Sequence, residues 1–272
     1  MIGFGSNRLT IARRGGMSVT QAGRGGMEWL AGGRYPDWAT PYSAQATAAL
    51  KAQFPTQWPT IRDYGFAHPA LVPFINEDPM LVMSLIEGLG VRWLIGNGSS
   101  YFKTTFKPTA TDMIKAKVMP TNIGANQVPY GARNVAGQAT TGSYQDWFLG
   151  NKLRMDWAVS NTTTIEAPNL TLTNNTVYVI EEKKGYCKVN GVVKYNQSVQ
   201  SETLLYPFYV FANNNAGSVG AITAMKFAYI YKNDEPLLVP FKRNNTAELL
   251  DLSTGQLAER VGSFTISETP AS

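Results

Sequence analysis

The sequence has very few of the side chains from which metal sites and nucleophilic active sites are built. Cys187 is the only cysteine and His68 the only histidine among 272 residues. One cysteine excludes an intrachain disulfide and a cysteine-based zinc site, and one histidine excludes the two-histidine zinc motifs. His68 lies in a proline-rich segment, where we expect a structural role because acid–base chemistry needs an oriented partner. The sequence predicts no metal site and no cofactor.

Motifs of the common enzyme classes are also missing. The chain contains no Gly-x-Ser-x-Gly elbow, no Walker A loop and no dinucleotide-binding fingerprint. It contains no Asp-rich loop that would supply the clustered oxygen ligands of a calcium site. We therefore expect a protein without enzymatic activity.

Long apolar runs are absent as well. No window reaches the roughly eighteen uninterrupted apolar residues that a membrane span requires, and the longest candidate is residues 80–86. Charged and polar residues interrupt any secretory apolar segment near the amino terminus. The sequence predicts a soluble protein that is made in the cytoplasm and has no membrane partner.

The first 36 residues form a basic, glycine-rich arm. They contain nine glycines, five arginines and one acid, Glu28, so that their net charge is +4. The arginines, which are the candidate residues for anchoring the chain to an assembly, are Arg8, Arg13, Arg14, Arg24 and Arg34. Lysine is absent before Lys51 and aromatics are not interleaved with these arginines, so a nucleic-acid partner is not expected. The whole chain, at +5, is expected to be attracted to acidic surfaces.

Two further segments precede the β-rich part of the chain. Residues 43–54 begin with Ser43 and are rich in alanine, which predicts one short helix that Pro55 ends. Residues 55–79 contain five prolines with aromatic residues between them. Such a segment is expected to lie extended over another surface, because proline interrupts both helices and central strands.

From residue 80 onward, the sequence predicts short strands separated by closely spaced turns. The candidate strands are residues 81–87, 91–95, 101–107, 113–120, 147–149, 152–159, 162–167, 176–183, 186–189, 192–195, 204–212, 225–231, 237–241 and 248–252. Asn190-Gly191 gives the sharpest hairpin signal, since both residues tolerate the positive φ of a type I′ turn. This pattern favours a β-sandwich or barrel over alternating strands and helices.

Several segments, taken in order, resemble concanavalin A-like (laminin G-like) jelly-roll domains of tailed-bacteriophage structural proteins. They are LIEGLG at 85–90, YFKTTFKP at 101–108, YGARN at 130–134, TVYV at 176–179, FYVFAN at 208–213 and LLDLSTG at 249–255. The resemblance covers residues 80–266, about two thirds of the chain. It implies a mainly β protein, an antiparallel β-sandwich preceded by an extended amino-terminal arm with one short helix.

The resemblance also implies a domain plan and a role. Residues 1–80 would be an anchoring and oligomerisation arm, residues 81–266 the jelly roll and residues 267–272 a tail. The leading hypothesis is a non-enzymatic virion protein, such as a head-fibre, decoration or tail-appendage subunit, with other virion proteins as partners. A homo-oligomer, with a trimer favoured, is expected because an extended proline-rich segment cannot bury itself alone.

A second hypothesis is a module that binds host-surface or mucosal glycans. Its candidate contacts are Trp147, Trp157, Asn151 and Asn161, because lectin sites pair an aromatic ring with amides. Both tryptophans also fit core positions, which is the favoured interpretation. The third hypothesis, a glycan hydrolase, is the least favoured, because the Glu-x-Asp-x-Glu pattern of glycanases with this fold is absent.

Overall fold

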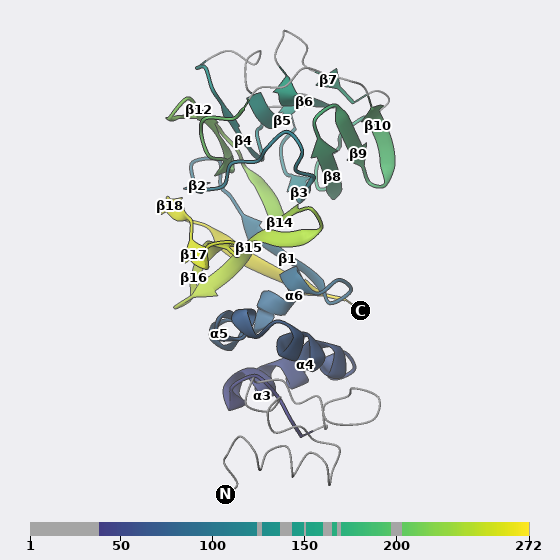
Figure 1. The fold of residues 1–272 in the computed structure, drawn as a ribbon, viewed down its shortest axis with the longest axis vertical. Coiled ribbons are helices and arrows are strands. Elements are labelled where there is room, and N and C mark those ends of the chain that lie inside the picture. Colours follow the sequence, from purple (N-terminus) through teal and green to yellow (C-terminus); the bar gives the residue numbers. More distant parts are fainter. Residues whose placement is uncertain are drawn as a thin grey trace, which may run out of the picture. The chain divides into compact units, whose positions relative to one another are not determined.

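The chain divides into two compact units with different secondary structure. In the computed structural model the first unit is Met1–Leu89 and the second is Gly90–Ser272. The structure describes residues 38–123, 127–136, 143–149, 151–159, 165–167, 170–196 and 203–271. The first unit contains helices and the second contains strands (Figure 1). The predicted boundary at residues 80 and 81 therefore falls inside the helical unit.

The predicted helix of the first unit is confirmed. Helix α3, Ala44–Gln53, begins at Ser43, whose side chain accepts a 3.2 Å hydrogen bond from the backbone N–H of Ala46. That bond satisfies one of the N–H groups that have no partner within the helix. The hydroxyl of Tyr42 donates a 2.7 Å hydrogen bond to the carbonyl of Ile61 and so joins the start of α3 to the following helix.

The prediction of an extended segment at residues 55–79 was wrong, because this part of the chain is helical. It forms α4 (Trp58–Ala67), the 3₁₀ helix η1 (Pro69–Leu71), α5 (Val72–Glu77), the 3₁₀ helix η2 (Pro79–Leu81) and α6 (Val82–Leu85). Apart from α6, each has a proline at its first or second position. Proline is favoured there, since its missing N–H has no partner within a helix anyway. Within the described residues, no helix could span a membrane.

The strand predicted at residues 81–87 was also wrong, because η2 and α6 occupy most of it. A short apolar run does not distinguish a buried helix from a buried strand. The residues that follow turn through Gly88 and Gly90, both with positive φ, before the first strand.

One sheet of the β unit, sheet A, has ten strands among the described residues. Its main order is β10 (Val192–Asn196), β9 (Tyr186–Val189), β8 (Tyr178–Lys183), β3 (Ile114–Pro120), β14 (Met225–Lys232), β15 (Glu235–Arg243), β16 (Thr246–Asp251) and β17 (Gln256–Leu257). Strand β1 (Gly90–Ile95) pairs with β14 and with β19 (Thr265–Pro270). The residues predicted to form a tail therefore continue β19, which pairs along β1 as far as Pro270.

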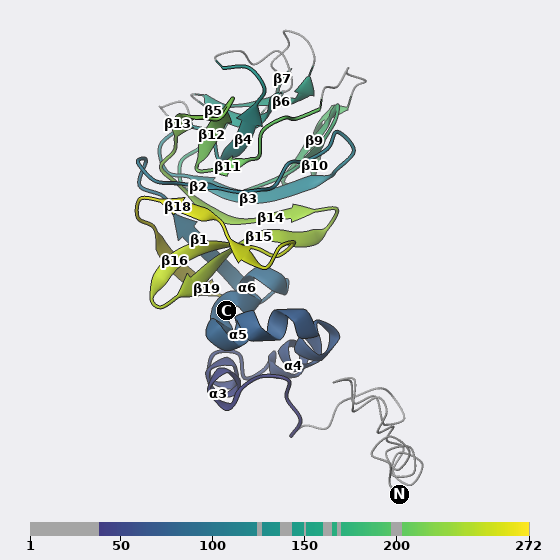
Figure 2. The same ribbon diagram turned by 60° about the vertical axis from the view of Figure 1, so that its left-hand side comes forward.

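The second sheet, sheet B, has nine strands among the described residues. Its order is β18 (Glu259–Val261), β2 (Tyr101–Lys103), β11 (Tyr209–Val210), β4 (Tyr130–Arg133), β5 (Ser143–Leu149), β6 (Lys152–Val159) and β7 (Ile165–Glu166). Strand β12 (Ala212–Asn215) pairs with β4 and β13 (Ser218–Ile222). The β4–β12 pair is parallel, whereas the other recorded strand pairs are antiparallel. Figure 2 shows the two sheets of the unit from a second direction.

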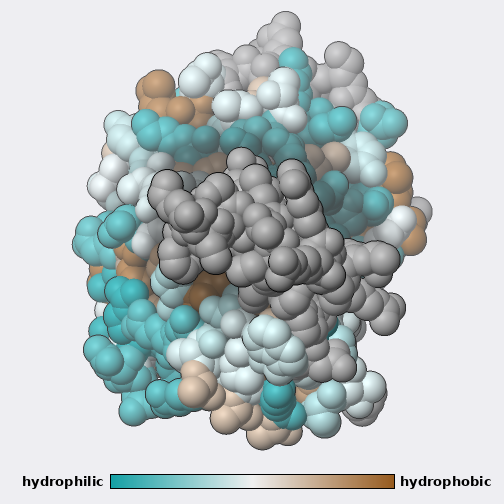
Figure 3. Space-filling view, turned by 60° about the horizontal axis from the view of Figure 1, so that its bottom comes forward, coloured by the Kyte–Doolittle hydropathy of each residue, from teal (hydrophilic) through white to brown (hydrophobic). Residues whose placement is uncertain are grey.

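The two sheets enclose one apolar core. In β3 the buried residues alternate with half-buried ones, so that Ile114, Ala116 and Val118 point inward. Phe148 and Val210 from sheet B belong to the same buried cluster. Each large apolar side chain buried in this way contributes about 1.5–3 kcal/mol to folding. The predicted mainly β, antiparallel sandwich is confirmed. On the face that Figure 3 shows, the described hydrophobic residues form small separate groups.

The turns follow the predicted chemistry closely. Asn190 and Gly191 both have positive φ, at 48° and 82°, and join β9 to β10 as a two-residue hairpin. Asn244 and Asn245, at 50° and 62°, do the same between β15 and β16. Asparagine tolerates this conformation better than most residues, which fixes the register of both hairpins.

A buried carboxylate links the two sheets across the core. Glu182 of β8 is fully buried, and its Oε1 accepts a 2.9 Å hydrogen bond from the hydroxyl of Tyr130 in β4. This hydrogen bond offsets part of the free-energy cost of burying the two polar groups.

We predict that Glu182→Ala lowers the free energy of unfolding by about 2–4 kcal/mol, because it leaves the buried Tyr130 hydroxyl without this acceptor and opens a cavity. Glu182→Gln keeps an acceptor oxygen and should cost less than half as much. Urea unfolding of the full chain measures both values. Equal losses in the two variants would contradict a role for the hydrogen bond.

A second polar anchor lies just before β3. Thr109 donates its backbone N–H to Asp112 Oδ2 at 2.8 Å, and Lys232 Nζ lies 3.3 Å from the same oxygen. Burial alone would raise the pKa of Asp112, but hydrogen bonds from the backbone and side chain of Thr109 and the charge of Lys232 outweigh it and lower the pKa.

A carboxylate whose pKa is lowered on folding stabilises the protein above its unfolded pKa of about 3.9 and loses this effect as the pH falls through its folded pKa. We therefore expect the wild type to lose more stability than Asp112→Asn between pH 5 and pH 2. Urea unfolding across that range tests this. Parallel pH profiles for the two proteins would show that Asp112 contributes nothing.

Candidate functional site

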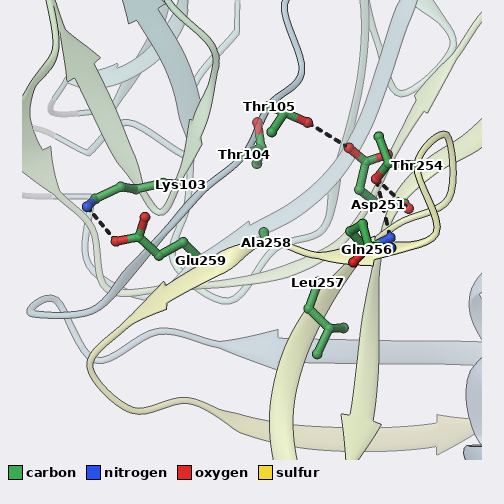
Figure 4. Close-up of a pocket in the computed structure, with 9 residues that line it drawn as sticks. All are labelled: Lys103, Thr104, Thr105, Asp251, Thr254, Gln256, Leu257, Ala258 and Glu259. Carbon is green, nitrogen blue, oxygen red and sulfur yellow. Dashed lines mark hydrogen bonds and ion pairs between the residues drawn. The ribbon is translucent and has the colours of Figure 1, made fainter.

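A cleft of about 310 Å³ lies where the chain passes from sheet A to sheet B. The residues that line it come from the end of β2, the end of β16, the following turn, β17 and the start of β18. They are Lys103, Thr104, Thr105, Asp251, Thr254, Gln256, Leu257, Ala258 and Glu259 (Figure 4). Its volume is at the lower end of the range for sites that bind small molecules.

An ion pair forms one side of the cleft. Lys103 of β2 and Glu259 of β18 are directly opposite each other in the sheet, and Lys103 Nζ lies 2.6 Å from Glu259 Oε1. The hydrogen bond with Glu259 raises the pKa of Lys103. Lys103 therefore stays charged at neutral pH, and the pair offers a donor and an acceptor at the edge of the cleft.

Asp251 forms the opposite side. Its Oδ1 accepts hydrogen bonds from the backbone N–H and the hydroxyl of Ser253, at 2.9 and 2.6 Å. These bonds close the turn after β16, which is the usual effect of an aspartate two residues before its donor. Its Oδ2 accepts a longer bond of 3.4 Å from Thr105 Oγ1 and lies on the cleft side of the carboxylate in Figure 4.

The remaining lining residues combine polar and small apolar groups. Gln256 is exposed, and its backbone N–H donates a 3.3 Å hydrogen bond to Thr254 Oγ1. Leu257 and Ala258 supply apolar surface beside it. A flexible amide next to fixed carboxylates suits a ligand with several hydroxyl groups, because an amide both donates and accepts.

A pair of tyrosines lies next to this cleft on sheet B. Tyr209 of β11 is directly opposite Lys103, and its ring stacks on that of Tyr101 with 5.5 Å between the ring centres. Burial raises the pKa of Tyr209, so its hydroxyl stays protonated at neutral pH. The half-buried Tyr101 presents an apolar ring beside the charged edge of the cleft.

The arrangement is suited to hydrogen bonding. Within the described residues, no three histidine, cysteine, aspartate or glutamate side chains gather as metal ligands. The lining residues of the cleft offer a ligand two carboxylates, an ammonium group, an amide and threonine hydroxyls, and a pair of aromatic rings lies at its edge.

The two tryptophans that the sequence singled out lie in paired strands. In the β5–β6 hairpin, Trp147 stands opposite Arg154 and Trp157 stands opposite Tyr144. The side chains of Trp147 and Trp157 lie outside the described part. The role of both tryptophans as glycan contacts therefore stays a prediction.

Asn151, another predicted contact, is not among the residues that line the cleft. Asn151 is exposed between β5 and β6, and its carbonyl accepts a 2.7 Å hydrogen bond from the N–H of Leu172. Asn161 lies outside the described residues, as do the five anchoring candidates Arg8, Arg13, Arg14, Arg24 and Arg34. Their roles stay predictions.

Sequence reasoning missed the residues of the cleft for a clear reason. Lys103 and Glu259 are 156 positions apart, and no local pattern joins them. Asp251 belongs to a segment read only as a turn, although an aspartate followed by Ser253 and Gly255 does indicate a side chain held by its own turn.

Comparisons with known proteins give only distant likenesses. No protein-family model matches the chain, and no curated protein matches it. A Bacteroides ovatus protein with a proposed role in carbohydrate binding has 11% identity and a TM-score of 0.47, over 68% of this chain and 62% of its own. Domains LG4-5 of the mouse laminin α1 chain have 12% identity and a TM-score of 0.40, over 68% of this chain and 48% of theirs.

A third solved structure, a heptameric SAP-like pentraxin of Limulus polyphemus, has 11% identity and a TM-score of 0.36. The match covers 56% of this chain and 79% of the pentraxin. At these identities and TM-scores, the likenesses say nothing about what this chain binds.

The side chains of the cleft should differ in their importance for folding. Asp251→Ala removes the acceptor of two turn hydrogen bonds and should lower the free energy of unfolding by about 1–3 kcal/mol. Gln256→Ala removes an exposed side chain and should change it by less than about 0.5 kcal/mol. Urea unfolding checks both values, and a large loss with Gln256→Ala would show that this amide is structural.

Proposed function

We propose that the β unit is a carbohydrate-binding module and that the cleft between β2 and β16–β18 is its site. The observation that carries the proposal is the set of charged, amide and hydroxyl groups around this cleft, next to the stacked Tyr101 and Tyr209. Sugar hydroxyls both donate and accept hydrogen bonds, and the apolar face of a sugar ring packs on aromatic rings. Both features are present here, the polar groups on β2 and on β16–β18 and the tyrosine pair on β2 and β11.

Binding without hydrolysis is part of the proposal. A glycosidase needs one carboxylic acid to protonate the leaving oxygen and a second carboxylate to act on the sugar or on water. Glu259 is held by Lys103, and Asp251 closes its own turn through Ser253. Both carboxylates are therefore engaged in contacts within the chain that a pair of catalytic carboxyl groups would have to give up.

A second candidate is a structural subunit of a bacteriophage particle, located in the virion as a head-fibre, decoration or tail-appendage protein. The division at Leu89 and Gly90 favours it, since an amino-terminal unit and its basic leader precede the β unit. In this proposal the leader would bind other virion proteins and the β unit would be displayed. The two candidates are compatible, because a displayed module can bind a glycan.

Homo-oligomerisation, with a trimer favoured, remains part of this second candidate. Its original reason does not hold, since residues 58–85 form helices that contain buried side chains, among them Ile61 and Ile75. The measurement that decides it is the mass of the purified chain by analytical ultracentrifugation.

The cleft is tested by binding to a neutral glycan array and by titration of any glycan that binds. We expect Gln256→Ala to reduce affinity about two- to tenfold, because each lost hydrogen bond costs about 0.5–1.5 kcal/mol, and its combination with Lys103→Gln to reduce affinity about tenfold or more, because bonds to charged groups cost more. Gln53→Ala, which changes the same residue type in the helical unit, is the matched control. Unchanged affinity in the cleft variants would refute the site, and no binding on the array would refute the activity.

The virion candidate is tested by deleting residues 1–36. The β unit should stay folded, since its strands lie beyond residue 89, while incorporation into particles should be lost. Circular dichroism checks the fold, and immunoblots of purified particles measure incorporation. Particles that take up the shortened chain as well as the full one would rule out the leader as an anchor.

A further inference from the structure

A second surface of the β unit gathers lysines and tyrosines on neighbouring strands. In β3, Ile114, Ala116 and Val118 point into the core, so Lys115 and Lys117 lie on the outer face of sheet A. Outward positions of the paired strands extend this surface, which we name the basic face. Its members are Lys115 and Lys117 of β3, Lys183 of β8, Tyr186 and Lys188 of β9, and Lys226, Tyr229 and Tyr231 of β14.

Strand register places these residues side by side. Lys117 is opposite Tyr229, and Lys115 is opposite Tyr231 on one side and Glu181 on the other. Glu181 is in turn opposite Lys188. Neighbouring strands lie about 4.8 Å apart, so one row of alternating side chains crosses four strands from β9 to β14.

The tyrosines hold lysine side chains against the sheet. Lys117 Nζ lies 6.0 Å from the centre of the Tyr229 ring, and that ring packs on Tyr231 with 4.4 Å between centres. Lys183 Nζ lies 5.9 Å from the ring centre of Tyr186 in the same way. Such cation–π contacts position the ammonium groups before any ligand binds, which reduces the entropy lost on binding.

Two carboxylates interrupt the positive charge. Lys188 Nζ is 2.7 Å from Glu181 Oε2, and this hydrogen bond raises the pKa of Lys188, with a smaller effect from the charge of Asp234. Five lysines therefore face two nearby carboxylates, which leaves an excess of positive charge on this sheet. Glu181 stands between Lys115 and Lys188 in the row, so the basic face offers a hydrogen-bond acceptor between two of its cations.

We propose that the basic face binds an acidic polysaccharide, whose negative groups are separated by hydroxyl-bearing sugar rings. The charge excess would attract its sulfate or carboxylate groups, and Glu181 and Asp234 would accept hydrogen bonds from sugar hydroxyls. A DNA backbone fits less well, since deoxyribose phosphates offer the carboxylates no hydroxyl donor. The rings of Tyr229 and Tyr231 are packed on each other, which disfavours stacking on successive bases.

This site is separate from the cleft in its residues and in its ligand. The lining of the cleft comes from β2 and from residues 251–259, and it shares no side chain with the basic face. The two proposals can therefore fail independently. Gln256→Ala should leave binding at the basic face unchanged, while loss of the lysines should leave binding at the cleft unchanged.

The test compares two polymers that differ only in charge. The full chain is passed over immobilised dextran sulfate and unsulfated dextran of the same length, at several salt concentrations. We expect binding to dextran sulfate alone, with an affinity that falls as salt rises, because bound counterions are released. The double variant Lys115→Gln and Lys117→Gln should weaken binding on the order of tenfold and flatten the salt dependence.

A matched control removes the same charge elsewhere. Lys51→Gln combined with Lys152→Gln, in the helical unit and in sheet B, should change the affinity less than about twofold. Melting temperatures confirm that both double variants fold. Equal affinity for the two dextrans, or equal losses in the two double variants, would overturn the proposal. Stronger binding to a single-stranded DNA oligonucleotide than to dextran sulfate at matched charge would also overturn it, in favour of a nucleic-acid surface.

Discussion

The backbone ladder of β14 is the constraint on which the rest of the β unit depends. This strand pairs with β3 along most of its length, with β15 at one end and with β1 at the other. Successive residues of a strand point to opposite faces, and a bulge between Phe227 and Tyr229 shifts this alternation by one residue. Phe227 and Ile230 therefore both face the core, while Tyr229 faces outward. A slip of one residue would exchange the apolar interior with the row of lysines and tyrosines, and both the core and the basic face would be lost together.

Local chemistry was enough to predict much of the β unit. Asn190-Gly191 needed only its own backbone preferences to form a hairpin, and β3 needed only the alternation of lysine with apolar residues. Prolines were harder to interpret, because proline both interrupts helices and favours their first turn. Pro59 and Pro73 favour a helix only if the chain begins one at those positions. Tertiary packing, which the local sequence does not encode, determines whether it does.

The candidate site depends on contacts that no local pattern encodes. Lys103 meets Glu259 only because β18 joins the edge of sheet B directly after the chain has formed β14–β17 of sheet A. Which residues of β5 and β6 stand opposite each other is likewise set by the register of this hairpin, and a bulge between Ser143 and Tyr144 makes that register hard to predict from the sequence.

The route of the chain through Ala258 has a mechanical consequence. Gln256 and Leu257 belong to sheet A, whereas Glu259 already belongs to sheet B, so a single residue separates the two layers here. The backbone N–H of Ala258 donates a 2.9 Å hydrogen bond to the carbonyl of Leu249, which ties this crossing to β16. Any molecule held in the cleft would touch both layers at their junction and resist their separation. A bound molecule would therefore raise the melting temperature of the whole sandwich and the force needed to unfold it.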